Sequence, residues 1–129
     1  MKKEFIMDLP ARFYDAMRLF DAGEYFECHE VLEELWREEP TSLRLFYQGL
    51  LQVAVGCYHL TVRYNRRGAL SKLQAGLDKL GQFPAVMHLL DVEDLRQQVQ
   101  ALVEQVKAMT DEEIAAFERT PLLTVRYLT

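Results

Sequence analysis

Two histidines, His29 and His59, are the side chains whose neighbours could support chemistry in this sequence. His29 and Glu33 are four residues apart, so on a helix they lie on the same face. Two imidazoles and one carboxylate can hold a divalent metal, and His29, Glu33 and His59 would supply that set. Glu30 or a water could then act as general base in a small metal-dependent hydrolase.

The same residues also have a structural interpretation. A buried His29 that is hydrogen-bonded to Glu33, with Gln52 bonding across to it, would satisfy every polar group without any chemistry. The segment from His29 to Glu33 matches the His-Glu-x-x-His zinc motif only in part, because Glu33 stands where the second histidine belongs. The sequence therefore favours a bracing network over a catalytic site.

Two predicted helices position these residues. The first runs from about residue 24 to residue 38, and Trp36 flanks its His29–Glu33 face. The second contains Leu45–Val62, which has no charged side chain and is predicted to be a buried central helix. At 3.6 residues per turn, one line along this helix carries Leu45, Gln48, Gln52, Gly56 and His59.

The stretch Leu45–Val62 is long enough to raise the question of a membrane span. Its polar side chains argue against one, because Gln48, Gln52 and His59 would be costly in hydrocarbon. If the two helices pack antiparallel, the polar line meets His29 and Glu33 in one partly dry groove. Two glycines, Gly49 and Gly56, predict that a neighbouring helix approaches closely.

The rest of the chain predicts further helices. One begins near Asp8 and Pro10 and reaches Phe20; others cover residues 69–80 and 91–109, with a capping box at 110–113 that opens a short last helix. Residues 65–68 read as a solvated turn and residues 81–90 as an irregular apolar segment across the core. The tail after Pro121 is apolar enough to dock on this chain or on a second copy.

These elements predict an all-α fold: a single helical domain over residues 1–129, with five to six helices in a bundle. Two helical hairpins, loosely similar to tetratricopeptide hairpins, surround the central helix, and a C-terminal helix pair follows. The seam of Leu95, Val99, Leu102, Val106 and Met109 could serve inside the domain or across a homodimer.

Composition limits the function. The 129 residues carry a net charge of −5, which disfavours nucleic acid as the main partner. Cys28 and Cys57 lie in apolar helical patterns, as expected for buried thiols in a reducing cytoplasm. The N-terminal residues carry charges within a short apolar run, so no signal peptide is expected.

The motifs resemble a small prokaryotic family known only as domain of unknown function, family 309. Its first signature is similar to Phe20-x-x-Gly23-x-Tyr25-Phe26-x-x-His29-Glu30-x-x-Glu33-x-x-Trp36. A second is similar to Gly49-Leu50-Leu51-Gln52-x-Ala54, Tyr58-His59 and Asn65-x-x-Gly68-Ala69, and a looser third to Asp91-Val92-x-x-Leu95. The resemblance implies an all-helical domain with no established activity, and the residues that carry over are His29, Glu30, Glu33, Trp36, Gln52, His59 and Asn65.

The sequence thus leaves two functional hypotheses. The favoured one is a non-enzymatic helical module that binds a partner or itself through the groove around His29 and through the C-terminal seam. The alternative is the metal-dependent hydrolase built on His29, Glu33 and His59. A homodimer would form through the helix at 92–109 or through the C-terminal tail, and no membrane partner is expected.

Overall fold

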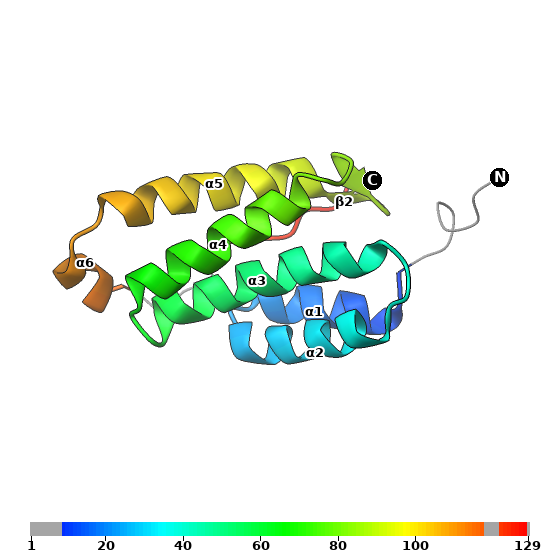
Figure 1. Cartoon of the computed structure of the whole chain (residues 1–129), viewed down its shortest axis with the longest axis horizontal. Coiled ribbons are helices and arrows are strands. Elements are labelled where there is room, and N and C mark those ends of the chain that lie inside the picture. Colours follow the sequence, from blue (N-terminus) through cyan, green and yellow to red (C-terminus); the bar gives the residue numbers. More distant parts are fainter. Residues whose placement is uncertain (1–8, 118–121, 129) are drawn as a thin grey trace.

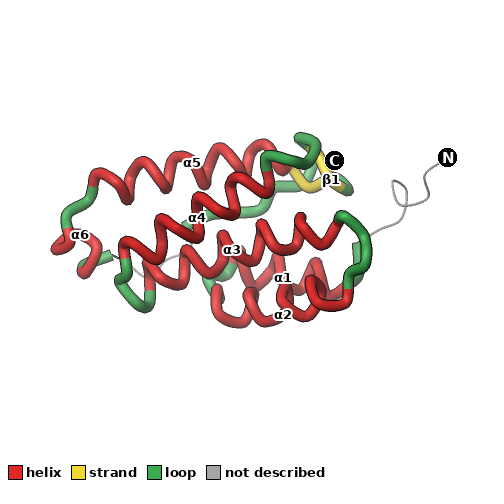
Figure 2. The backbone as a smooth tube through the Cα atoms, in the orientation of Figure 1, coloured by secondary structure: helices red, strands yellow, loops and turns green. Residues whose placement is uncertain are grey.

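The computed structural model describes residues 9–117 and 122–128. The elements in this part of the chain are α1 (Ala11–Asp21), α2 (Tyr25–Glu38), α3 (Leu43–Thr61), α4 (Arg66–Leu80), β1 (Val86–Met87), β2 (Leu90–Asp91), α5 (Val92–Ala108) and α6 (Asp111–Ala115). The long helices lie along the long axis of the molecule, and each packs against the next one in sequence (Figure 1). Helices dominate the described residues, among which strands occur only in one small hairpin (Figure 2). The predicted all-α bundle is confirmed.

Helix α3 lies between α2 and α4 and forms the centre of the bundle (Figure 1). Its core side chains are almost completely buried, as for Phe46, Val53 and Cys57. One stripe of α3 is only half-buried, and it carries Gln48, Leu51, Gln52, Val55, Tyr58 and His59. The predicted central helix is therefore present, and its polar line faces the outside between two neighbouring helices. None of the described helices is both long and apolar enough to cross a membrane.

Glycines set the distance between α3 and α4. A Cβ atom on Gly76 of α4 would lie 2.7 Å from the carbonyl oxygen of Gly49, and one on Gly56 would lie 2.7 Å from Cγ of Leu73. Real Cβ atoms do not come this close to other heavy atoms, so the two backbones pack at a separation that only glycine allows. The close approach predicted for Gly49 and Gly56 is confirmed, whereas the matching role of Gly76 was not predicted.

The connection between α3 and α4 lies earlier in the chain than predicted, at residues 62–65. The residues expected to form a turn, 65–68, instead contain the N-cap and first turn of α4, because the Asn65 side chain accepts a hydrogen bond of 2.9 Å from the backbone N–H of Gly68. The chain reverses at Tyr64, whose φ is 50°. Arg66 is not a solvated side chain either: it donates to the carbonyl oxygens of Val106 and Lys107 at the end of α5.

The segment predicted to be irregular forms a short β-hairpin. Val86 pairs with Asp91 and Met87 pairs with Leu90, and the two residues between the strands, His88 and Leu89, have φ values of 49° and 69°. Two consecutive positive φ values are typical of the tight turn that suits hairpin twist. The hairpin leads directly into α5, which begins next to Asp91 as predicted, and the Asp91 side chain is its N-cap.

The C-terminal tail docks on this chain. Leu123 is buried, the N–H of Val125 donates to the Asp21 carboxylate, and the N–H of Leu128 donates to the carbonyl oxygen of Leu89. The apolar seam of α5 is also used inside the chain, because Leu95, Val99, Leu102 and Val106 are all buried. Association of two copies through these elements stays a prediction, but the apolar side chains expected to drive it already have partners within the chain.

Candidate functional site

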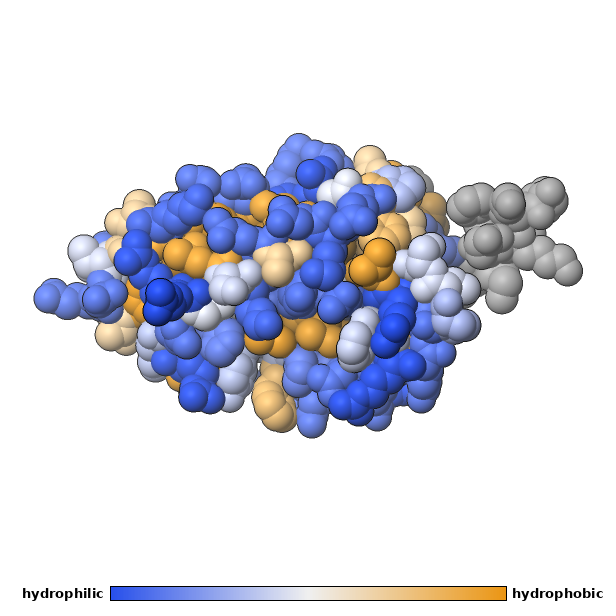
Figure 3. Space-filling view, in the orientation of Figure 1, coloured by the Kyte–Doolittle hydropathy of each residue, from blue (hydrophilic) through white to orange (hydrophobic). Residues whose placement is uncertain are grey.

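A groove opens on the face of the bundle where α2, α3 and α4 meet. Its volume is ≈ 340 Å³, and its lining is His29, Glu33 and Trp36 from α2, Gln48, Leu51, Gln52 and Val55 from α3, and Lys72 from α4. In the space-filling view this face is mostly hydrophilic, with hydrophobic patches near its middle (Figure 3). The groove therefore combines polar walls with an apolar part of the floor.

His29 and Glu33 form the α2 wall. Their side chains are 25% and 34% exposed, and Nε2 of His29 lies 3.3 Å from Oε2 of Glu33. The other carboxylate oxygen of Glu33 accepts a hydrogen bond of 2.7 Å from Arg37. Glu33 is thus paired on both sides, and the four-residue spacing places His29 and Glu33 together as the sequence predicts.

The floor contains a polar atom that lacks a partner. Oε1 of Gln52 is buried and accepts no hydrogen bond from any residue within 9–117 and 122–128. Leaving a buried acceptor without a donor destabilises the protein by about 1–3 kcal/mol. A ligand or a water that donates a hydrogen bond to this atom would therefore be stabilised there. Gln48 lies one turn earlier on the same floor.

Lys72 completes the groove and was not predicted. It is exposed on α4 and brings a positive charge to the wall opposite Glu33. Because α3 and α4 run antiparallel through a short connection, residue 72 lies level with residues 52–55. The signal that could have revealed it is the loop length, read together with the glycines that fix the register of this helix pair.

His59 lies outside the groove lining, at the end of α3. Its ring packs beside Gly68, where a Cβ atom would be 3.2 Å from Cγ of His59, and its Nδ1 atom is buried without a partner among the described residues. Burial lowers the pKa of His59, and the positive charges of Arg63 and Lys72 lower it further. His59 is therefore neutral at pH 7.

Aromatic rings separate the two imidazoles. The ring of Phe26 lies 5.8 Å from that of His29 and 5.6 Å from that of Tyr58, which in turn is 6.4 Å from that of His59. Among the residues that the structure describes, no three His, Cys, Asp or Glu side chains lie close enough together to hold a metal ion. The expected set of His29, Glu33 and His59 is thus not assembled in this conformation.

The other three candidate residues from the sequence, Trp36, Asn65 and Glu30, lie apart from one another. Trp36 closes one end of the groove, and the Arg44 guanidinium lies 4.6 Å from the centre of its ring. Asn65 acts as the N-cap of α4, which is a structural role. Glu30 is exposed on α2, one residue beyond His29, and does not line the groove.

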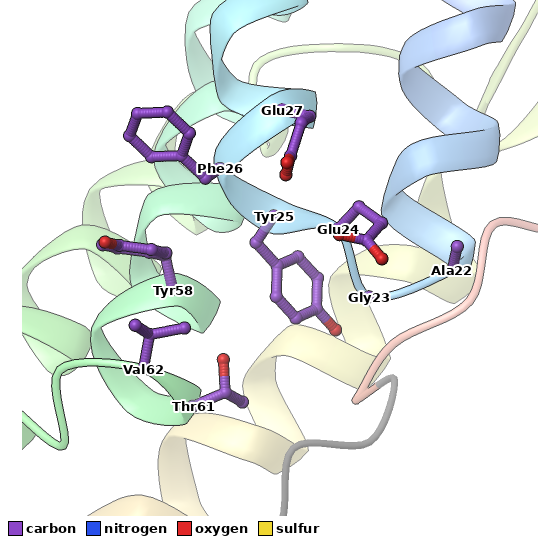
Figure 4. Close-up of a pocket in the computed structure, with 9 residues that line it drawn as sticks. All are labelled: Ala22, Gly23, Glu24, Tyr25, Phe26, Glu27, Tyr58, Thr61 and Val62. Carbon is purple, nitrogen blue, oxygen red and sulfur yellow. The ribbon is translucent and has the colours of Figure 1, made fainter.

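A second hollow adjoins the first beyond Phe26. Its volume is ≈ 450 Å³, and it is lined by residues 22–24 of the α1–α2 connection, by residues 25–27 of α2, and by Tyr58, Thr61 and Val62 (Figure 4). The hydroxyl of Tyr25 accepts a hydrogen bond of 2.8 Å from the backbone N–H of Leu122. No motif in the sequence predicts this hollow, although Gly23, Tyr25 and Phe26 belong to the first signature.

The buried thiols and phenol do not supply a nucleophile. Burial raises the pKa of Cys28 to about 12, and it raises the pKa values of Cys57 and Tyr25 well above their ordinary values. All three groups are therefore protonated at neutral pH, and a protonated thiol is a poor nucleophile. What the described geometry offers is hydrogen bonding, charge and apolar contact.

The fold and the groove define an all-helical bundle with a mixed polar and apolar recess on one face. Residues 13–71, which span α1 to the first part of α4 and include most of the groove, match the family model described as "Domain of unknown function (DUF309)". The chain is therefore similar to this family over residues 13–71, and the resemblance given by its motifs is confirmed.

A curated relative is similar over a longer stretch. The "Uncharacterized protein YpuF" of Bacillus subtilis (strain 168) is 36% identical over 106 residues, which cover 78% of this chain and 60% of the relative. The chain therefore spans about 60% of the length of the relative that it matches. The name of that protein states no activity.

Proposed function

We propose that this chain is a non-enzymatic helical module, a single domain over residues 1–129, that binds a partner or itself through the groove between α2, α3 and α4. The observation that carries the proposal is the buried Oε1 atom of Gln52, which has no donor within the described residues although it lies on the floor of the groove. A partner that donates a hydrogen bond to a buried, unpaired acceptor stabilises the complex, because it removes the cost of leaving that acceptor unpaired.

The lining supports binding rather than catalysis. Both oxygens of the Glu33 carboxylate already contact side chains of this chain, one that of His29 and the other that of Arg37. A hydrolase of the kind considered above needs metal ligands that the described residues do not bring together. Interfaces, in contrast, commonly combine aromatic residues, a few hydrogen-bonding groups and charged rims.

The chemistry of the two cysteines supports a cytoplasmic location. Cys28 and Cys57 are both free and buried. Free thiols persist in reducing compartments, whereas exported proteins tend to use their cysteines in disulfides. We therefore place the module in the cytoplasm.

Site-specific photocrosslinking tests the proposal. A benzophenone amino acid replaces Val55 on the groove floor, and in a control variant it replaces the exposed Ala101 of α5. In cells that express the chain, we expect the groove variant to form one defined protein adduct that the control does not form. Mass spectrometry identifies the adduct as a second copy or another protein. The absence of adducts, or the same adducts from both positions, would overturn the proposal.

Metal dependence is tested separately. Protein purified without an affinity tag is melted with and without a chelator, and with added Zn²⁺ or Mn²⁺. We expect the melting temperature to stay constant, because no described group of three ligands would bind the ion and stabilise the native state. A rise with near-stoichiometric metal, reversed by the chelator, would restore the hydrolase hypothesis.

A further inference from the structure

The two helices that border the groove carry opposite charges. Helix α2 has five carboxylates and one guanidinium, a net charge of −4, whereas α4 has four cationic side chains and one carboxylate, a net charge of +3. The whole chain is acidic, so this segregation does not follow from composition. The helix that forms one rim of the groove is thus net negative, and the helix that forms the other rim is net positive.

Some of these charges are used inside the chain. Glu34 and Glu38 pair with Arg12 of α1, and Arg66 caps the end of α5. Two exposed side chains differ from them: Lys72 of the α4 wall, and Glu30 of α2, which lies outside the lining but directly follows the groove residue His29. Neither has an ion-pair partner within residues 9–117 and 122–128. The two rims therefore keep unneutralised charge of opposite sign.

Apolar surface lies between and beside the rims. Leu51 and Val55 are half-buried on the floor, and the ring of Phe26 is 47% exposed at one end of the groove. Burial of such surface drives association, while charge at the rim selects the partner and its orientation. The occupant should thus present apolar side chains flanked by a positive edge on one side and a negative edge on the other.

We infer that the occupant of the groove is a second copy of this chain. A two-fold axis parallel to α3 and lying in the groove would place α2 of each copy over α4 of the other. The negative rim then meets the positive rim twice, once on each side of the axis, as an isologous interface requires. No other orientation of a face-to-face pair joins both rims to opposite charge, because an axis perpendicular to α3 would set α4 against α4.

The size of the α2–α3–α4 face sets the expected affinity of the dimer. Nineteen residues give α3 a length of about 28 Å, and three helices spaced about 8–10 Å apart give a face about 25 Å wide. The contact would thus be about 700 Å² per copy, slightly below the ~800 Å² of a standard interface. We expect a reversible dimer with a dissociation constant in the micromolar range.

This inference rests on the proposed function and is tested by sedimentation velocity of the full chain from about 5 to about 500 µM, a range that brackets micromolar association. Wild type should shift from monomer to dimer. Glu30→Lys and Lys72→Glu should each weaken the dimer at least tenfold, and the double variant should recover most of the loss because the rims have exchanged sign. Circular dichroism verifies that each variant is folded.

Glu104→Lys is the matched control. Glu104 is exposed on α5, away from the groove, and its pair with Lys107 at 3.7 Å is also exposed. This variant changes the net charge as much as Glu30→Lys does and should leave the dimer unchanged. A monomer throughout the concentration range, or a double variant that is no better than the single ones, overturns the inference. If the groove crosslinks to another protein in that case, the proposed function stands without the dimer.

Discussion

Replacing Gly76 by alanine is the sharpest test of the helix packing beneath the groove. The new methyl group would lie 2.7 Å from the carbonyl oxygen of Gly49, 2.7 Å from Cγ2 of Val53 and 3.1 Å from the backbone nitrogen of Val53. Two of these three atoms belong to the backbone of α3, so no side-chain rotation relieves the contact. The two helices must move apart by several tenths of an ångström.

The expected change in the free energy of unfolding is the difference between two opposing effects. Overpacking of this kind costs about 1–3 kcal/mol, and the higher helix propensity of alanine returns up to about 1 kcal/mol. We therefore expect Gly76→Ala to lower the free energy of unfolding by about 1–2 kcal/mol, which corresponds to a drop in melting temperature of roughly 3–8 °C for a chain of this size.

Urea unfolding followed by circular dichroism measures the effect, with Gly81→Ala as the control. A Cβ atom on Gly81 would have its nearest contacts at 3.4 Å, an ordinary distance, and the backbone φ of −64° suits alanine. The control should be neutral or slightly stabilising, by up to about 1 kcal/mol. If Gly76→Ala is as stable as Gly81→Ala, the helices are not packed as closely as the structure indicates, and the register that brings Lys72 to the groove loses its basis.

Three further predictions concern the groove and its supports. Gln52→Leu should leave stability unchanged or raise it by about 1–2 kcal/mol, since it removes an unpaired buried acceptor. The same variant should weaken groove crosslinking; a marked fall in melting temperature would show that Gln52 is satisfied and structural. Arg66→Ala should destabilise the protein by about 1–2 kcal/mol, because two hydrogen bonds to the last carbonyls of α5 are lost. Arg67 is exposed, so Arg67→Ala should have little effect on stability. Equal melting temperatures for these two variants would show that Arg66 does not stabilise the end of α5. In an NMR titration His59 should become protonated only below its ordinary pKa, because burial opposes its charge. The unfolded chain then binds the extra proton, so the contribution of His59 to stability should fall as the pH drops from about 6.5 toward the lowered pKa. Lys72→Gln should raise that pKa only in part, since burial is its main cause; a pKa at or above the ordinary value in wild type would refute this account.

The sequence alone determined the features that depend on local physics. Apolar periodicity predicted the all-α class. Local residue types predicted the starts of the last two helices: α5 begins next to Asp91, and the capping box of Thr110 and Glu113 opens α6. The pairing of His29 with Glu33 is also local, because one helical turn fixes it whatever the rest of the chain does. In each case the partners lie within four residues of each other.

Tertiary structure decided which distant residues share a surface. Lys72 joined the groove and His59 was left beyond its end, because the register of α3 against α4 is set by glycine contacts that no periodic pattern reveals. The same is true of Arg66, whose acceptors are 40 and 41 residues away in the sequence. Hydrophobic patterns state which side of a helix is buried but not how far it slides along its neighbour, and a slide of one turn changes the side chains that meet.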